Sequence, residues 1–158
     1  MKDAGGRPDL AVETGDYGSL GRHVAAIRDS VFVRGMGVPE EIEHDDRDHF
    51  CVHVLLRADG LPAATGRLDV DRDGKIGRVA VLTRYRGMGL GSRVMDELED
   101  LAARYGLDRV WCHAQRTAEG FYRRRGWRTV SWEFMEAGIP HVRMEKKLST
   151  DGDGGVSQ

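Results

Sequence analysis

The chain has 158 residues, of which 32% are charged, and its formal net charge is −2. This length suits a single hydrophobic core, and the balanced charge excludes the basic excess that supports sequence-independent binding to nucleic acid. The sequence has no run of roughly 20 apolar residues that could span a bilayer and no apolar signal core in residues 1–8, so we expect a cytoplasmic protein without a membrane partner.

The two ends of the chain differ in composition from its centre. Residues 1–8 and 149–158 are small and polar, which predicts flexible termini around one domain at residues 9–148. Two cysteines, Cys51 and Cys112, lie in separate apolar runs without a CxxC partner. This arrangement favours buried thiols over a disulfide or a zinc site.

The first predicted elements are a short strand and a helix. Residues 10–14 alternate between apolar and polar side chains, as a strand does. After a glycine-containing turn, Ser19 is a suitable N-cap for a helix with apolar residues at helical spacing. These apolar residues are Leu20, Val24, Ile27 and Val31. In the acidic connector that follows, residues 38–48, the spacing of carboxylates and imidazoles matches no defined metal site, so we interpret it as a solvated loop without a metal.

Three strands and a long helix come next. Residues 50–57, 61–70 and 75–81 predict an antiparallel meander, because turns that contain Asp-Gly join the neighbouring runs. A helix begins near Leu90, since apolar residues recur at positions 90, 94, 98 and 101, and Gly106 stands at its C′ position.

The last third of the predicted domain alternates between short elements. Residues 109–114 form a strand, Thr117 caps a short helix that ends at Gly126, and residues 129–134 and 141–148 form two more strands. The helix between residues 81 and 110 suits a parallel crossover. We therefore expect an α/β (α+β) fold with a mixed, mostly antiparallel central sheet of about seven strands flanked by about four helices.

The run R-G-M-G-L-G at residues 86–91, between a strand and the long helix, is the most informative motif. Its three glycines let the backbone approach a ligand closely and adopt dihedral angles that other residues avoid. The N-terminus of the helix and Arg86 add positive charge, so the turn suits a pyrophosphate. A dinucleotide fingerprint would need a glycine where Ser92 stands, and a P-loop would need a lysine. A tight turn without a ligand is the remaining alternative.

The spacing of this turn resembles the Arg/Gln-x-x-Gly-x-Gly/Ala signature of the GNAT N-acetyltransferase superfamily. The resemblance implies that the turn holds the pyrophosphate of acetyl-CoA. It also implies that the sheet is splayed in the middle, where the pantetheine arm bonds to an open strand edge. The cofactor-binding residues that it implies here are Val79, Ala80, Val81, Arg86, Gly87, Met88, Gly89, Leu90, Gly91 and Ser92.

A second motif at the expected distance supports the resemblance. Residues 114–127 read A-Q-x-x-A-x-x-F-Y-x-x-x-G-W. The resemblance implies that Gln115, Phe121, Tyr122 and Arg124 contact acetyl-CoA, and that Tyr122 donates a proton or a hydrogen bond to the departing thiolate. An aromatic side chain that only packs on the sheet is the alternative for Tyr122.

Residues near the end of the predicted domain indicate which branch of the superfamily the chain resembles. The segment E-F-M-E-A-G-I-P-H at residues 133–141, with the earlier segments V-F-V and V-P-E-E, resembles the ElaA-like branch of the superfamily. That branch often has Glu-Gln after V-F-V, whereas this chain has Arg34-Gly35. If the Glu-Gln pair of that branch belongs to the acceptor pocket, this difference predicts a different acceptor substrate for this chain.

Acetylation of an amine also requires a proton acceptor. Candidate bases are His53, Glu133 and His141, each in or beside a predicted strand, and the same residues could contact the acceptor. Arg67 and Arg78 have apolar neighbours in strands and could either hold an acceptor carboxylate or lie half-exposed.

We therefore expect an N-acetyltransferase that moves an acetyl group from acetyl-CoA to a primary amine of a small molecule or peptide by direct attack. Neither cysteine has an activating neighbour, so no covalent enzyme intermediate is expected. An acyl-CoA-binding regulatory module without turnover is the alternative, and thiol release with amines would separate the two. Dimers are common in the superfamily, which leaves a homodimer open.

Overall fold

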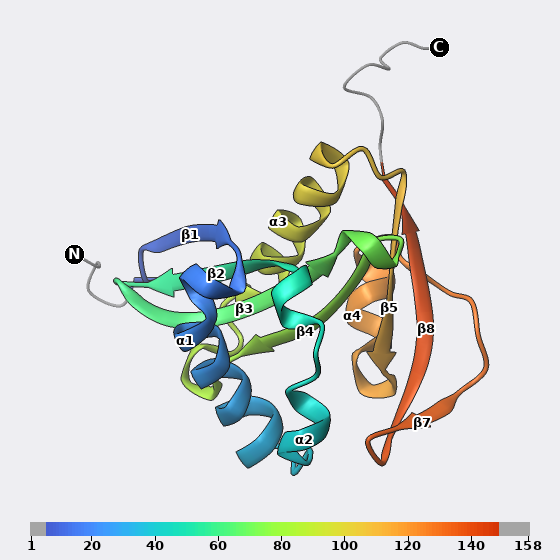
Figure 1. Ribbon diagram of the computed structural model, residues 1–158, viewed down its shortest axis with the longest axis horizontal. Helices are drawn as coiled ribbons and strands as arrows, with labels where there is room; N and C mark the ends of the chain where they lie inside the picture. The colour runs from blue at the N-terminus through green and yellow to red at the C-terminus, as the bar shows by residue number, and fades with distance from the viewer. Residues whose placement is uncertain (1–5, 149–158) are drawn as a thin grey trace.

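The structure is a computed structural model that describes residues 6–148. Of the flexible ends predicted at residues 1–8 and 149–158, residues 1–5 and 149–158 lie outside the described residues. Eight strands form one sheet in the order β1-β2-β3-β4-β5-β8-β6, and β7 pairs with β8 (Figure 1). The pair β4 and β5 is parallel and the others are antiparallel, so the sheet is mixed, as predicted.

The elements follow the predicted order. The strands are β1 Leu10–Gly15, β2 Val52–Ala58, β3 Leu61–Asp69, β4 Lys75–Val81, β5 Arg109–Gln115, β6 Arg128–Thr129, β7 Phe134–Glu136 and β8 Ile139–Lys147. The helices are α1 Tyr17–Arg28, α2 Glu40–Glu43, α3 Leu90–Arg104 and α4 Glu119–Arg124, and a π-helical segment, Asp29–Arg34, extends α1. Within residues 6–148 no helix is long and apolar enough to cross a bilayer.

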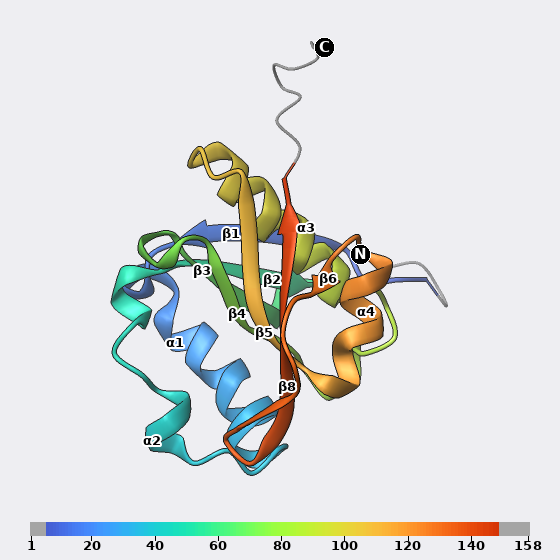
Figure 2. The same cartoon turned by 90° about the vertical axis from the view of Figure 1, so that its right-hand side faces the viewer.

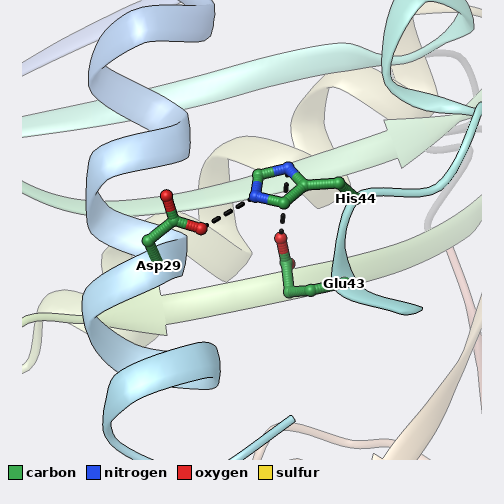
Figure 3. Close-up of side chains that lie close together, drawn as sticks. All are labelled: Asp29, Glu43 and His44. Carbon is green, nitrogen blue, oxygen red and sulfur yellow. Dashed lines mark hydrogen bonds and ion pairs between the residues drawn. The ribbon is translucent and has the colours of Figure 1, made fainter. Parts of the chain in front are cut away.

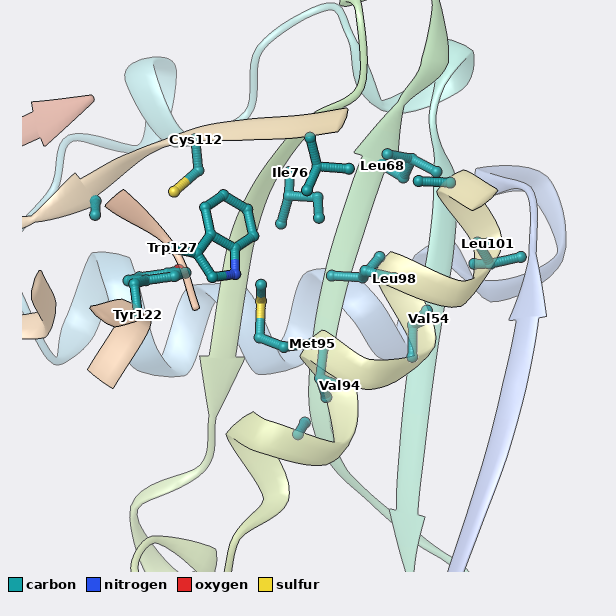
Figure 4. Packing of buried hydrophobic residues seen from close by; sticks show 14 of the residues in the cluster. Val54, Leu68, Ile76, Val94, Met95, Leu98, Leu101, Cys112, Tyr122 and Trp127 are labelled. Carbon is teal, nitrogen blue, oxygen red and sulfur yellow. The ribbon is translucent and has the colours of Figure 1, made fainter. Parts of the chain in front are cut away.

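Helices cover both faces of the sheet (Figure 1, Figure 2). Val94 and Leu98 of α3 share one buried cluster with Val54 of β2, and α1 shares a second cluster with Leu55 of β2 and Ala80 of β4. Adjacent residues of β2 thus serve opposite faces, because side chains alternate along a strand. Figure 4 shows the larger cluster, on the α3 side.

Helix α1 begins earlier than predicted. Its N-cap is Asp16 and not Ser19, because the Asp16 carboxylate accepts a hydrogen bond from the Ser19 N–H at 2.8 Å. A carboxylate satisfies this unpaired donor as well as a hydroxyl does. At the other end α1 passes into the π-helical segment, where Val31 is still buried.

Two predictions in the last third are wrong in detail. Thr117 does not cap α4, since it lies in a 3-10 turn and the N-cap position falls on Ala118, whose side chain makes no capping bond. The predicted strand 129–134 is divided into β6 and β7. Between them, the Ser131 hydroxyl and not a backbone carbonyl accepts the hydrogen bond from the Arg143 N–H at 2.8 Å.

The sheet is splayed between β4 and β5. In the described part of the chain these strands pair at one position, Lys75 with Trp111. On their outer sides β4 pairs with β3 as far as Val81, and β5 pairs with β8 along its whole length. The inner edges of both strands therefore diverge, and Arg78, at φ +53°, interrupts the regular β4 ladder. This is the splay predicted in the middle of the sheet.

Both cysteines are free and buried, as predicted. Burial raises the pKa of the Cys51 thiol and of the Cys112 thiol to about 12. A thiol with such a pKa is a poor nucleophile near neutral pH.

Candidate active site

A cleft of about 720 Å³ opens where β4 and β5 diverge. One group of lining residues, which we call the turn side, comes from the end of β4, the glycine turn, the end of β5 and α4. The turn side consists of Val79, Ala80, Val81, Arg86, Gly91, Gln115, Ala118, Phe121 and Tyr122. We call the remaining lining residues the hairpin side; they come mainly from the π-helical segment, the loops around α2, the start of β4 and the β7–β8 hairpin. The hairpin side consists of Val31, Phe32, Met36, Val38, Ile42, Glu43, Asp45, Arg67, Lys75, Ile76, Gly77, Arg78, Cys112, His113, Glu136, Ala137, Ile139 and His141.

The glycine turn carries a row of unpartnered backbone donors. Gly87 and Gly89 have φ angles of +80° and +81°, and Gly89 is the N-cap of α3 without a side-chain capping bond. A Cβ atom added at either glycine would meet nothing within 4 Å, so the dihedral angle and not crowding requires glycine. Within residues 6–148, the N–H groups of residues 87–92 donate to no other group of the chain. Such donors at the positive end of a long helix suit an anion.

Most of the predicted cofactor contacts border the cleft. Those that line it are Val79, Ala80, Val81, Arg86, Gly91, Gln115, Phe121 and Tyr122. Gly87, Met88, Gly89 and Ser92 belong to the adjoining turn and the first turn of α3. Two predictions fare differently: the Leu90 side chain is buried in the core, and Arg124 is exposed and does not line the cleft.

Tyr122, the predicted proton donor, lines the cleft. Its ring packs against Phe121 and Trp127, with centroids 5.2 and 5.3 Å apart, and the residue is 9% exposed. Burial, and then the neighbouring Cys112, raise the pKa of the Tyr122 hydroxyl. The hydroxyl is protonated at neutral pH, as an unperturbed phenol already is, and can donate a hydrogen bond at the cleft wall.

Several residues of the hairpin side belong to a buried ion-pair network. Arg28 is fully buried and donates to Glu43 Oε2 at 2.8 Å and to Asp48 Oδ1 at 2.7 Å. Arg67 donates to the same oxygen of Asp48 at 2.8 Å and to Asp45 Oδ2 at 2.7 Å. Burial opposes the charge of Asp48, but hydrogen bonds from the two guanidinium groups lower its pKa overall. The prediction of a solvated acidic loop is therefore wrong for Glu43, Asp45 and Asp48, because these carboxylates meet arginines from α1 and β3. Other carboxylates of the connector are exposed, as predicted, namely Glu40, Glu41 and Asp46.

Arg78 is held in the same network. Its Nε lies 3.1 Å from Glu43 Oε2, and its terminal nitrogen lies 3.2 Å from Asp45 Oδ2. Arg67 already uses both terminal nitrogens on Asp45 and Asp48. The guanidinium nitrogens that would bind an acceptor carboxylate in a two-pronged contact are therefore already engaged by carboxylates of the network. We do not assign Arg67 and Arg78 that predicted role, although both line the cleft.

The side chains of Asp29, Glu43 and His44 converge beside α1 (Figure 3). His44 Nε2 lies 2.8 Å from Asp29 Oδ1, and His44 Nδ1 lies 3.7 Å from Glu43 Oε1. The three groups are close enough to hold a cation, but Glu43 already neutralises Arg28. We assign no metal to this cluster.

Three side chains from neighbouring strands meet on the hairpin side. Oε1 of Glu136 lies 2.8 Å from His113 Nδ1, and Oε2 lies 3.8 Å from His141 Nε2. The hydrogen bond with His113 is the main cause of a lowered pKa at Glu136. His141 Nδ1 lies 2.7 Å from the Ile139 carbonyl oxygen. A carboxylate and two imidazoles are therefore gathered at the cleft.

A match to a family model identifies the family of the chain. The family model described as "Acetyltransferase (GNAT) domain" matches residues 31–148. The chain belongs to the GNAT acetyltransferase family. The uncharacterized N-acetyltransferase YjcF of Bacillus subtilis is 37% identical to it over 122 residues, which are 76% of this chain and 87% of YjcF. The resemblance predicted from the two motifs is confirmed, and with it the activity of an N-acetyltransferase, for which amine acetylation from acetyl-CoA is the general reaction of the family.

Solved GNAT structures share the fold. An acyl-CoA N-acyltransferase from Pseudomonas aeruginosa superimposes with a TM-score of 0.79 at 29% identity, over 87% of this chain and 99% of that chain. Escherichia coli ElaA superimposes with a TM-score of 0.77 over the same shares of the two chains. At 23% identity, the likeness to ElaA is one of fold.

Two predicted catalytic residues of this GNAT chain lie outside the cleft lining. His53 is fully buried, its Nε2 lies 2.9 Å from the Asp48 carbonyl oxygen, and burial lowers its pKa. Glu133 is exposed, with its carboxylate 3.6 Å from Arg116. We therefore withdraw both as base and as acceptor contacts. Of the three predicted bases, His141 is the one that lines the cleft.

The sequence interpretation missed Glu136 and His113. His113 lies two residues before Gln115 on β5, so the two side chains are on the same face of the strand. The predicted cofactor contact of Gln115 could therefore have pointed to His113. Glu136 lies in the segment that carried the ElaA-like resemblance. Their contact depends on how β5, β7 and β8 pair, which the local pattern does not reveal.

Proposed function

We propose that this cleft binds acetyl-CoA and that the protein acetylates a primary amine of a small molecule or peptide there. The observation that carries the proposal is the unpartnered N–H row of residues 87–92 beside the open inner edge of β4, both bordering one cleft. Bound there, acetyl-CoA would supply an activated thioester. The residues present fit its two polar parts, the pyrophosphate and the pantetheine amides.

The turn side would position the donor. The N–H groups of residues 87–92 and the Arg86 guanidinium would hold the pyrophosphate, as a helix N-terminus holds other phosphates. Arg86 Nε already donates to the Val81 carbonyl at 3.2 Å, which ties its side chain to the end of β4. Backbone groups of Val79 to Val81 on the open edge would bond to pantetheine amides, as in strand addition.

Tyr122 would act on the leaving group. Its hydroxyl is protonated at neutral pH, as phenols are, and the residue lines the cleft. Oη–H can then donate a hydrogen bond or a proton to the thiolate as the amine takes the acetyl group. The acceptor would enter from the hairpin side, where Phe32, Met36 and Ile42 add apolar wall to the polar groups.

Two measurements on the purified protein test the proposal. Calorimetric titration with CoA should show saturable binding, and thiol release from acetyl-CoA should accelerate when suitable primary amines are added. Binding without thiol release for any amine in a broad panel would favour a regulatory module that binds acyl-CoA. Absence of CoA binding would overturn the proposal altogether.

A further inference from the structure

His141 is held in one tautomer by its surroundings. Its Nδ1 lies 2.7 Å from the Ile139 carbonyl oxygen, and a carbonyl only accepts hydrogen bonds. The proton of the neutral ring must therefore be on Nδ1, which leaves the lone pair on Nε2. The ring also stacks on Phe134 at 6.0 Å with an interplanar angle of 22°, which fixes its plane.

Glu136 presents a second acceptor beside that lone pair. Its Oε2 lies 3.8 Å from His141 Nε2, which is too long for a hydrogen bond, and a neutral His141 has no proton to offer at that atom. The other oxygen, Oε1, is held by His113 at 2.8 Å. When the His141 ring is neutral, two acceptor atoms therefore face each other without a donor between them, and a ligand with several N–H groups satisfies both.

The positively charged side chains near Glu136 and His141 have other partners. Arg28, Arg67 and Arg78 are matched by the carboxylates of Glu43, Asp45 and Asp48 in the buried network. Lys75 also acts electrostatically on Glu136, but its ammonium lies over the Trp111 ring, 5.1 Å from the centroid. In the described part of the chain, Lys75 and Glu136 form no ion pair.

We propose that Glu136 Oε2 and His141 Nε2 form the subsite for the acceptor ammonium, and that His141 Nε2 is the base that deprotonates it. This inference rests on the proposed function and names the acceptor half of the same cleft. The ammonium donates to both atoms; one N–H bond then breaks, its electron pair stays on the amine nitrogen, and the proton bonds to His141 Nε2. Glu136 stabilises the imidazolium that forms, and the proton afterwards passes to solvent. His113 is a positioning residue that aims the carboxylate.

Chemical rescue tests the base directly. We expect His141→Ala to lower kcat for amine-dependent thiol release by about 10²-fold, the usual scale for a lost general base, with CoA affinity unchanged. Added imidazole should restore the rate at least about tenfold, because it can place a lone pair in the emptied space, which a merely structural role would not allow. The matched control His49→Ala removes an exposed imidazole outside the cleft lining, and it should match wild type with and without imidazole.

Glu136→Gln tests the ammonium contact with a side chain of the same shape. We expect it to raise KM for the amine by about tenfold or more, since a charge-assisted hydrogen bond is lost, without weakening CoA binding. Unchanged turnover in His141→Ala, failure of imidazole to rescue it, or an unchanged amine KM in Glu136→Gln would overturn this inference while leaving the proposed function intact. A wild-type protein that binds CoA but releases no thiol with any amine would instead overturn the proposed function.

Discussion

Tyr122 combines burial with a place on the cleft wall. Removing its hydroxyl while keeping the ring separates its chemistry from its packing against Phe121 and Trp127. We expect Tyr122→Phe to lower kcat for thiol release by about 10²-fold, the scale for a positioned acid, and to leave the Kd for CoA within a few-fold. Tyr105→Phe is the matched control, since Tyr105 is 54% exposed on the far end of α3, and its turnover should equal that of wild type. Full activity in Tyr122→Phe would remove the hydroxyl from the mechanism.

At the scale of elements, the glycine turn links β4 to α3 and sets the direction of the N–H row. Gly89 and Gly106 mark the two ends of α3, with φ angles of +81° and +85°, and neither would crowd an added Cβ. Alanine at either position should cost about 1 kcal/mol of stability, since a left-handed backbone is unfavourable for a residue with a Cβ. Only Gly89→Ala should weaken CoA binding, by about tenfold, as calorimetry would measure. Equal CoA affinity in both variants would disconnect the turn from the cofactor.

The buried network ties together α1, β3 and the loop around α2. Because the folded protein lowers the pKa of Asp48 below the unfolded value of about 3.9, Asp48 stabilises the fold above that pH. This stability is lost as the pH falls through the folded pKa. Asp48→Asn should therefore lower the unfolding free energy by about 3 kcal/mol at pH 7 and flatten its decline below about pH 4.

Chemical denaturation across this pH range measures the effect. Asp46→Asn is the control from the same connector, because Asp46 is exposed and should leave the curve unchanged. A curve for Asp48→Asn that runs parallel to that of wild type at all pH values would contradict the assigned role of the network.

For the molecule as a whole, local sequence patterns predicted the order of the elements, the mixed sheet and the family. They succeeded because side-chain periodicity and glycine positions report local backbone structure directly. The network escaped prediction because a run of carboxylates looks solvated until its partners, 15 or more positions away, are placed beside it. The same limit applies to Glu136 and His113, which are 23 positions apart and meet only through the pairing of β5, β7 and β8.

Titration of ¹⁵N-labelled protein with CoA, followed through the amide resonances, shows whether the N–H row and the open β4 edge hold the cofactor. We expect saturable shifts concentrated in residues 87–92 and 79–81, where the N–H row and the open β4 edge border the cleft. Spectra that do not change with CoA, or shifts confined to other parts of the molecule, would contradict this expectation.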